Sequence, residues 1–167
     1  MYTKKQNTKP QVISYERVKG YMLWMIERYG DYSAKALLHK ANLLFKDDTQ
    51  YNEPALEYLI ERDIINDLRY AQRLTESLTE KNIGLNKIKE KLYTKGFSSQ
   101  TINECITSVE TTDEDYFEKA LILKIRKFGE EPIEDIKLKQ KALRHLISKG
   151  FSYSIANKAI SYSAEEL

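Results

Sequence analysis

Apolar residues recur three and four positions apart along most of the chain, the spacing that places them on one face of an α-helix. In residues 85–95 they are Leu85, Ile88 and Leu92, and residues 99–109 show the same spacing. The pattern also predicts helices over residues 15–29, 33–45, 53–62, 68–81 and 115–128. Nearly every block between glycines and prolines reads this way, so the sequence predicts an all-α protein.

A short turn, Lys95-Gly96-Phe97-Ser98, separates the helices predicted over residues 85–95 and 99–109. Gly96 can adopt the left-handed conformation that ends many helices. Ser98 or Ser99 can cap the next helix, because a serine hydroxyl accepts a hydrogen bond from a free backbone N–H. We therefore expect a tight helical corner with Phe97 packed inside it.

The same unit occurs again near the end of the chain, where Lys149-Gly150-Phe151-Ser152 follows the first corner by 54 residues. This offset produces eight identities in a window of 23 residues, whereas chance would produce about one or two. The identities outside the corner are Lys87 with Lys141, Leu92 with Leu146, Asn103 with Asn157 and Ile106 with Ile160. The chain therefore contains an internal repeat.

A further helix precedes each copy, so the repeat has three helices. A degenerate copy occupies the front of the chain, with residues 46–50 in place of the glycine turn. We expect a polar N-terminal tail at residues 1–14 and three-helix repeats at residues 15–66, 67–111 and 112–167. Stacked in series they predict an elongated tandem array, with a radius of gyration above the ~15 Å of a compact globule of this length.

The composition is typical of a soluble folded protein and weakens most enzymatic interpretations. No apolar run approaches the ~20 residues of a membrane span, and the polar start lacks a signal peptide's apolar stretch. The single cysteine, Cys105, excludes an internal disulfide, so we expect a cytoplasmic protein. Nucleotide, zinc and nucleophile-elbow motifs are missing, so we expect no cofactor, no metal and no enzyme activity. An enzyme built on paired carboxylates stays an open alternative.

Charge is banded along the chain although the total nearly cancels, with 27 basic against 25 acidic side chains. The basic bands coincide with the middle helices of the repeats. Lys87, Lys91 and Lys95 are four residues apart and share one helix face, and the 54-residue offset maps them onto Lys141, His145 and Lys149. The candidate contacts are Lys87, Lys91, Lys95, Lys137, Lys141, Arg144 and Lys149, with Arg69 and Arg73 on the preceding helix as a second group. Such faces fit an anionic groove or a phosphate backbone, and a merely solvated face is the competing interpretation.

Other chemistry-bearing features favour structural interpretations. Trp24 and the twelve tyrosines could stack on bases, but most stand among helical apolar positions, so packing in a core or groove is favoured. The helical corners have the outline of a helix-turn-helix, yet the helix over residues 99–109 carries no arginine. The acidic run at residues 113–115 is expected to favour a helix N-terminus through the backbone dipole.

Several short motifs, taken in order, resemble the bacterial RecX family. Asp31-Tyr32-Ser33, followed by Leu37 and Lys40, is similar to that family's opening helix start. Residues 63–71, Asp-Ile-Ile-Asn-Asp-Leu-Arg-Tyr-Ala, are similar to its junction motif, with Asp63 where glycine is usual and Asn66 where an acidic residue is usual. Both Lys-Gly-Phe-Ser corners match its repeats, and the likeness covers about residues 15–163.

The resemblance implies a regulator of the RecA recombinase. Proteins of this family are expected to lie in the groove of the RecA–single-stranded-DNA filament, where they damp strand exchange, ATP hydrolysis and the co-protease activity of the SOS response. The expected partner is therefore the RecA filament on single-stranded DNA, with direct DNA contact also open, and we expect a monomer with no membrane association. The alternative is a helical nucleic-acid-binding protein without a RecA target.

Overall fold

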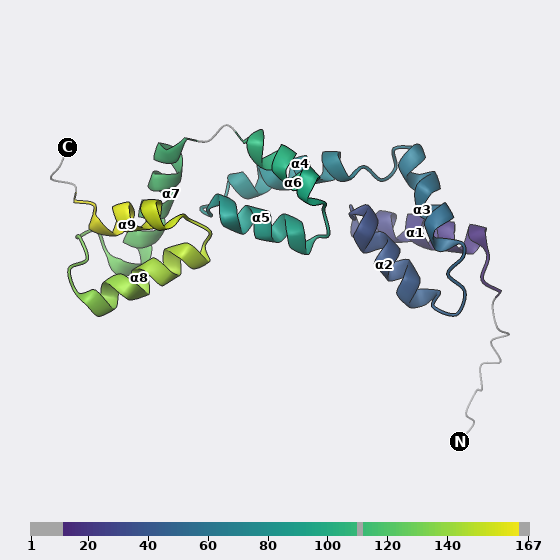
Figure 1. Cartoon of the computed structure of the whole chain (residues 1–167), viewed down its shortest axis with the longest axis horizontal. Helices are drawn as coiled ribbons and strands as arrows, with labels where there is room; N and C mark the ends of the chain where they lie inside the picture. The colour runs from purple at the N-terminus through teal and green to yellow at the C-terminus, as the bar shows by residue number, and fades with distance from the viewer. Residues whose placement is uncertain (1–11, 110–111, 164–167) are drawn as a thin grey trace, which may run out of the picture. The chain divides into compact units, whose positions relative to one another are not determined.

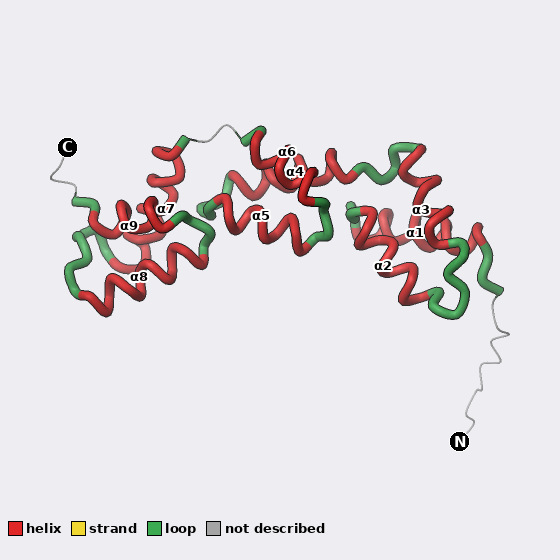
Figure 2. The backbone as a smooth tube through the Cα atoms, viewed as in Figure 1, coloured by secondary structure: helices red, strands yellow, loops and turns green. Residues whose placement is uncertain are grey.

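The computed structural model describes residues 12–109 and 112–163, and its regular structure within these ranges is entirely helical (Figures 1 and 2). The helices are α1 (Tyr15–Tyr29), α2 (Ala34–Leu44), α3 (Asn52–Glu61), α4 (Asp67–Thr79), α5 (Leu85–Thr94), α6 (Ser99–Thr107), α7 (Asp113–Phe128), α8 (Ile136–Ser148) and α9 (Tyr153–Ser161). The predicted all-α fold of three-helix repeats is confirmed. None of the helices within these ranges meets the length and hydrophobicity of a membrane span.

The chain divides into two compact units, Met1–Asn66 and Asp67–Leu167. In the first unit α1, α2 and α3 pack around one apolar cluster that contains Met22, Leu37 and Leu59. Phe45 ends α2 and is also buried there, edge-on to Tyr21 with ring centroids 5.5 Å apart. A buried phenylalanine thus closes this corner although the glycine turn is missing.

The second unit contains two triads of helices, α4 to α6 and α7 to α9, each around its own apolar cluster. Leu92 and Phe97 are buried in the former cluster, and their repeat equivalents Leu146 and Phe151 are buried in the latter. The internal repeat therefore has the same packing in both copies, because the same positions supply the core.

The corners form as the sequence predicts. Gly96 and Gly150 have φ of 92° and 93°, the left-handed region that side chains disfavour. Ser98 caps α6 by accepting a hydrogen bond from Thr101 N at 3.1 Å, and Ser152 caps α9 by accepting one from Ile155 N at 3.2 Å. These local bonds end one helix and start the next.

The acidic run starts a helix, as expected. Thr112 and Asp115 form a capping box, in which Asp115 N donates to Thr112 Oγ1 at 3.2 Å and Thr112 N donates to Asp115 Oδ2 at 2.8 Å. These hydrogen bonds lower the pKa of the Asp115 carboxyl.

The replacement of the family's usual glycine by Asp63 also has a physical explanation. Asp63 has φ 54°, and aspartate tolerates that conformation better than most residues.

A buried lysine, Lys124, fastens the connection between α7 and α8. Its ammonium donates to Glu130 O and to Glu131 O, both at 2.6 Å, and its side chain is fully buried. Burial lowers the pKa of Lys124, opposed by the nearby carboxylates of Glu131 and Glu130. In the sequence, Lys124 lies in a band, residues 111–135, whose net charge is negative, and no pattern distinguishes this lysine from the others.

Two predictions lie outside what the structure tests. The boundaries of the three predicted repeats stay predictions, and so does the elongation of the array. Residues 1–11 of the predicted tail lie outside the described residues, as do residues 110–111 and 164–167.

Candidate functional site

The basic positions of the third repeat lie along the solvent side of α8. Lys137, Lys141 and Lys149 are exposed, while Ala142 and Leu146 on the other side of the helix are buried. α8 contains no acidic residue, and among the described residues none of these three lysines forms an ion pair with a carboxylate. Their positive charge is therefore directed to solvent.

Arg144 is exposed on the same helix and lies close in rotation to Lys137, seven residues earlier. Its guanidinium Nε donates to Gln140 O at 3.3 Å, one turn back. The four predicted contacts of this repeat, Lys137, Lys141, Arg144 and Lys149, thus occupy one continuous exposed region of α8 and its C-terminal end.

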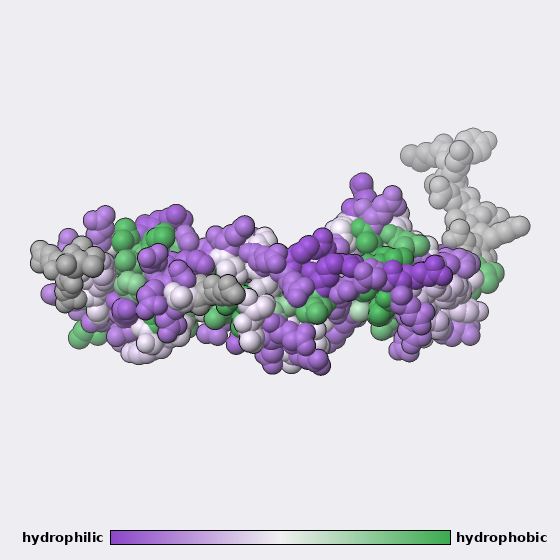
Figure 3. Space-filling view, turned by 90° about the horizontal axis from the view of Figure 1, so that it is seen from above, coloured by the Kyte–Doolittle hydropathy of each residue, from purple (hydrophilic) through white to green (hydrophobic). Residues whose placement is uncertain are grey.

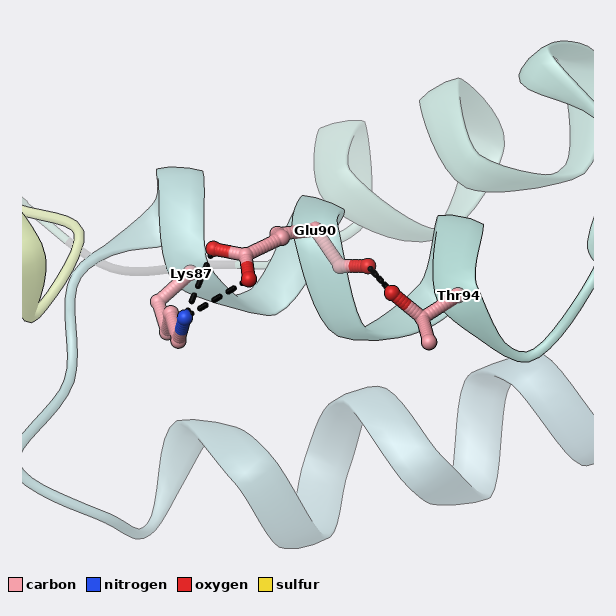
Figure 4. Close-up of polar contacts among 3 residues, drawn as sticks. All are labelled: Lys87, Glu90 and Thr94. Carbon is pink, nitrogen blue, oxygen red and sulfur yellow. Dashed lines mark hydrogen bonds and ion pairs between the residues drawn. The ribbon is translucent and has the colours of Figure 1, made fainter.

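In the second repeat, the acidic side chain of Glu90 is paired with one of the basic positions, Lys87. Lys87 Nζ lies 2.7 Å from both carboxylate oxygens of Glu90, and Thr94 Oγ1 donates to the backbone carbonyl of Glu90 at 2.8 Å (Figure 4). Glu90 stands at the position that Arg144 occupies 54 residues later. The ion pair is solvent-exposed, so its contribution to stability is below about 1 kcal/mol, but it weakens the positive potential around α5.

The remaining basic positions of α5 and α4 are also exposed. Lys91 and Lys95 continue the face that begins at Lys87, toward and beyond the end of α5. Arg69 and Arg73 lie one turn apart on α4, each two residues from the buried Ala71, so they point away from the core of the repeat. They form a group on their own helix.

Tertiary structure joins the faces of α8 and α5 end to end. Gly84 N donates to Lys149 O at 2.9 Å and Asn86 N donates to Gly150 O at 3.2 Å, so the corner after α8 caps the start of α5. A Cβ built on Gly150 would overlap the backbone N of Lys87. Lys87 therefore lies directly beside the corner that contains Lys149. We call the series Lys137, Lys141, His145, Lys149, Lys87, Lys91 and Lys95 the basic track.

The structure adds one cation, Lys127, that the sequence pattern did not indicate. Lys127, near the end of α7, places its ammonium 3.1 Å from His145 Nδ1. The ring of Phe128 lies edge-on to the imidazole, with the two ring centroids 5.8 Å apart. Burial, followed by the charges of Lys127 and Lys149, lowers the pKa of His145. No spacing rule could identify this pair, because its members belong to different helices.

The prediction that the aromatic side chains pack in a core is right for some residues and wrong for others, because Tyr93 and Tyr153 are 71% and 66% exposed. Tyr21, Tyr58 and Tyr70 are half-buried against the cores, as expected. Trp24 is 49% exposed and Tyr29 is 61% exposed, because both lie at positions of α1 that the other helices of the unit leave uncovered. Exposed apolar side chains are scattered over the protein, and one face shows separate hydrophobic areas within a mainly polar surface (Figure 3).

Cys105 is buried, with 1% of its surface exposed. Burial raises the pKa of its thiol, so it lacks the properties of a nucleophile. Within the described ranges no three histidine, cysteine, aspartate or glutamate side chains are grouped as a metal site would require.

Comparisons with known proteins agree on one family. Residues 113–160 match the family described as RecX, third three-helix domain. The chain is 33% identical over 136 residues to the regulatory protein RecX of Acinetobacter baylyi, covering 81% of this chain and 82% of that protein. It is 32% identical over 135 residues to the regulatory protein RecX of Clostridioides difficile, covering 80% of this chain but only 62% of that protein.

A solved structure shares the fold. The crystal structure of RecX from Lactobacillus salivarius superimposes with a TM-score of 0.71 at 22% identity, covering 87% of this chain and 94% of that one.

Proposed function

The chain belongs to the RecX family of regulatory proteins, and from this premise we propose that it binds the RecA–single-stranded-DNA filament and restrains RecA. It acts without chemistry of its own, as a monomer in the cytoplasm that occupies the groove of the filament. There it opposes addition of RecA and damps ATP hydrolysis, strand exchange and co-protease activity.

The basic track is the observation that supports this proposal. It combines six lysines and one histidine from two repeats, and Glu90 is paired with one of these lysines, Lys87. Successive members of one helix advance by about 6 Å, four residues at about 1.5 Å each. A groove with closely spaced negative charges, from DNA phosphates or from acidic residues of RecA, is the complementary surface.

The test is the ATPase activity of RecA on single-stranded DNA, measured over a range of concentrations of this protein. We expect inhibition at a low ratio to RecA. The double variant Lys87→Glu with Lys141→Glu removes one cation from each repeat and should raise the inhibitory concentration by about tenfold or more, since one lost phosphate contact costs about eightfold at 0.1 M salt.

The control is Lys89→Glu with Lys139→Glu, which changes the net charge equally on the opposite flanks of α5 and α8. Circular dichroism must show unchanged helix content in both double variants. No inhibition at any ratio would refute the proposal. Inhibition that appears only when the protein has coated the DNA would favour the alternative, a nucleic-acid-binding protein without a RecA target.

A further inference from the structure

In the third repeat, the last turns of α7 and α8 bring three basic side chains together. Lys127 lies in the last turn of α7, His145 in the last turn of α8, and Lys149 at the C-cap of α8. Lys127 and Lys149 are exposed, and His145 is half-buried. The cluster is therefore accessible at one point of the basic track.

The contact between Lys127 and His145 determines the state of the imidazole. A protonated Lys127 can only donate, so at 3.1 Å His145 Nδ1 accepts. The ring is then neutral and its proton is on Nε2, the opposite nitrogen. The cluster thus offers an N–H from His145 together with the remaining N–H donors of two ammonium groups.

Among the residues that the structure describes, the fold supplies hydrogen-bond donors at this cluster but no carboxylate paired with it. The charged groups that act on His145 are Lys127 from α7 and Lys149 from the end of its own helix, and both are positive. Within the described residues neither lysine is paired with a carboxylate. An anion between the three side chains would relieve this repulsion and accept from all three.

The neighbouring residues favour a phosphate backbone as the source of that anion. Lys141 and Lys137 continue from His145 along α8 at intervals of four residues, with no acid in the helix. A nucleic-acid strand presents a negative charge at every nucleotide, so it can match each interval. A protein would need a carboxylate at each of the same intervals.

We propose that Lys127, His145 and Lys149 bind a backbone phosphate of single-stranded DNA. This inference rests on the proposed function and deepens it, because it assigns the third repeat's end of the basic track to DNA rather than to RecA. The phosphate replaces the repulsion between the cations with attraction, so it also stabilises protonated His145. Binding is therefore coupled to uptake of a proton by the imidazole.

The experiment uses the two histidines of the chain as probes in proton NMR, without RecA. His39, on α2 in the first unit, is the internal reference, and the variants His39→Gln and His145→Gln assign the two signals. With saturating oligothymidylate we expect the titration of His145 to move to higher pH, while the signal of His39 at a fixed pH is unchanged by the oligonucleotide. The affinity for the oligonucleotide should rise about threefold between about pH 8 and pH 6, and His145→Gln should lose this dependence.

The variant Lys127→Met isolates the cluster. It should raise the pKa of His145 in the free protein, because a positive neighbour is removed, and weaken oligonucleotide binding about eightfold at 0.1 M salt. Lys89→Met is the matched control from the opposite flank of α5, and it should leave both measurements unchanged.

Two results would overturn the assignment: an unmoved His145 titration at saturating oligothymidylate, or a larger shift with polyglutamate, which would indicate a carboxylate partner. The ATPase assay separates this inference from the proposed function. Inhibition of RecA with an unmoved His145 would refute only the phosphate site. A moved His145 without inhibition would refute only the RecA target.

Discussion

Gly150 of the third repeat lies against Gly84 and Lys87 of the second, and we call this contact the seam. It leads to a prediction that can be tested by comparing three glycine variants. Gly150 is buried with φ 93°, and a Cβ added to it would overlap Lys87 N and crowd Gly84 O. The variant Gly150→Ala therefore combines backbone strain with a steric clash across the seam. Gly96→Ala and Gly84→Ala separate these two effects.

Gly96 is the strain reference, because it has φ 92° in the equivalent turn of the second repeat. A side chain in that conformation costs about 1–2 kcal/mol. Gly84 tests the clash, since its φ of −82° suits alanine but a Cβ there would overlap Gly150 O. If the two hydrogen bonds across the seam are lost at about 1 kcal/mol each, Gly84→Ala costs about 2 kcal/mol, and Gly150→Ala costs about 3–4 kcal/mol.

The assay is urea unfolding followed by circular dichroism, together with amide exchange of Asn86, whose N–H donates to Gly150 O. We expect faster exchange of Asn86 in Gly84→Ala and Gly150→Ala but not in Gly96→Ala. The double variant Gly84→Ala with Gly150→Ala should cost less than the sum of its parts, because both changes break the same contact. If Gly150→Ala is no more destabilising than Gly96→Ala, and Gly84→Ala has no effect, the seam does not form.

Three further predictions concern buried and titrating side chains. Lys124→Met should lower the free energy of unfolding by about 1–3 kcal/mol, because Glu130 O and Glu131 O lose their donor; an unchanged urea midpoint would contradict this. Stability should fall as the pH decreases through about 6.5, the pKa of a histidine in an unfolded chain, since the lowered pKa of His145 lets the unfolded chain take up the proton first; thermal melts of His145→Gln should show less of this fall. Cys105 should react with a thiol reagent at the rate of unfolding, because it is buried and burial raises its pKa; rapid reaction of the native protein would show that the site opens.

Much of the fold could be predicted because its determinants are local. Gly96 and Gly150 end their helices through their own backbone conformation, and Ser98 and Ser152 start the next ones by bonding three residues ahead. The 54-residue repeat then identified which apolar positions pack together within a triad. At Asp63 the residue type differs from the glycine of the family motif. Its backbone nevertheless has a positive φ, a conformation that glycine adopts readily.

The candidate site could be predicted only in part. Helical spacing placed Lys137 and Lys141 on one face, and the same rule placed Lys87 and Lys91 on another. The same rule could have flagged Glu90, which lies three residues from Lys87, but the prediction counted the lysines of that face and not its acid. The exposure of Trp24 was also missed, because the spacing of apolar residues along α1 does not tell which of them the other helices cover.

The sequence by itself determined an all-α chain, its repeat, its corners and the faces that carry positive charge, since each depends on residues a few positions apart. Only the tertiary structure decided that Lys87 lies against Gly150, that Lys127 reaches His145 and that Lys124 is buried beneath two carbonyl groups. These contacts join residues from different elements. Their geometry follows from how whole helices pack, a property that no local pattern of side chains encodes.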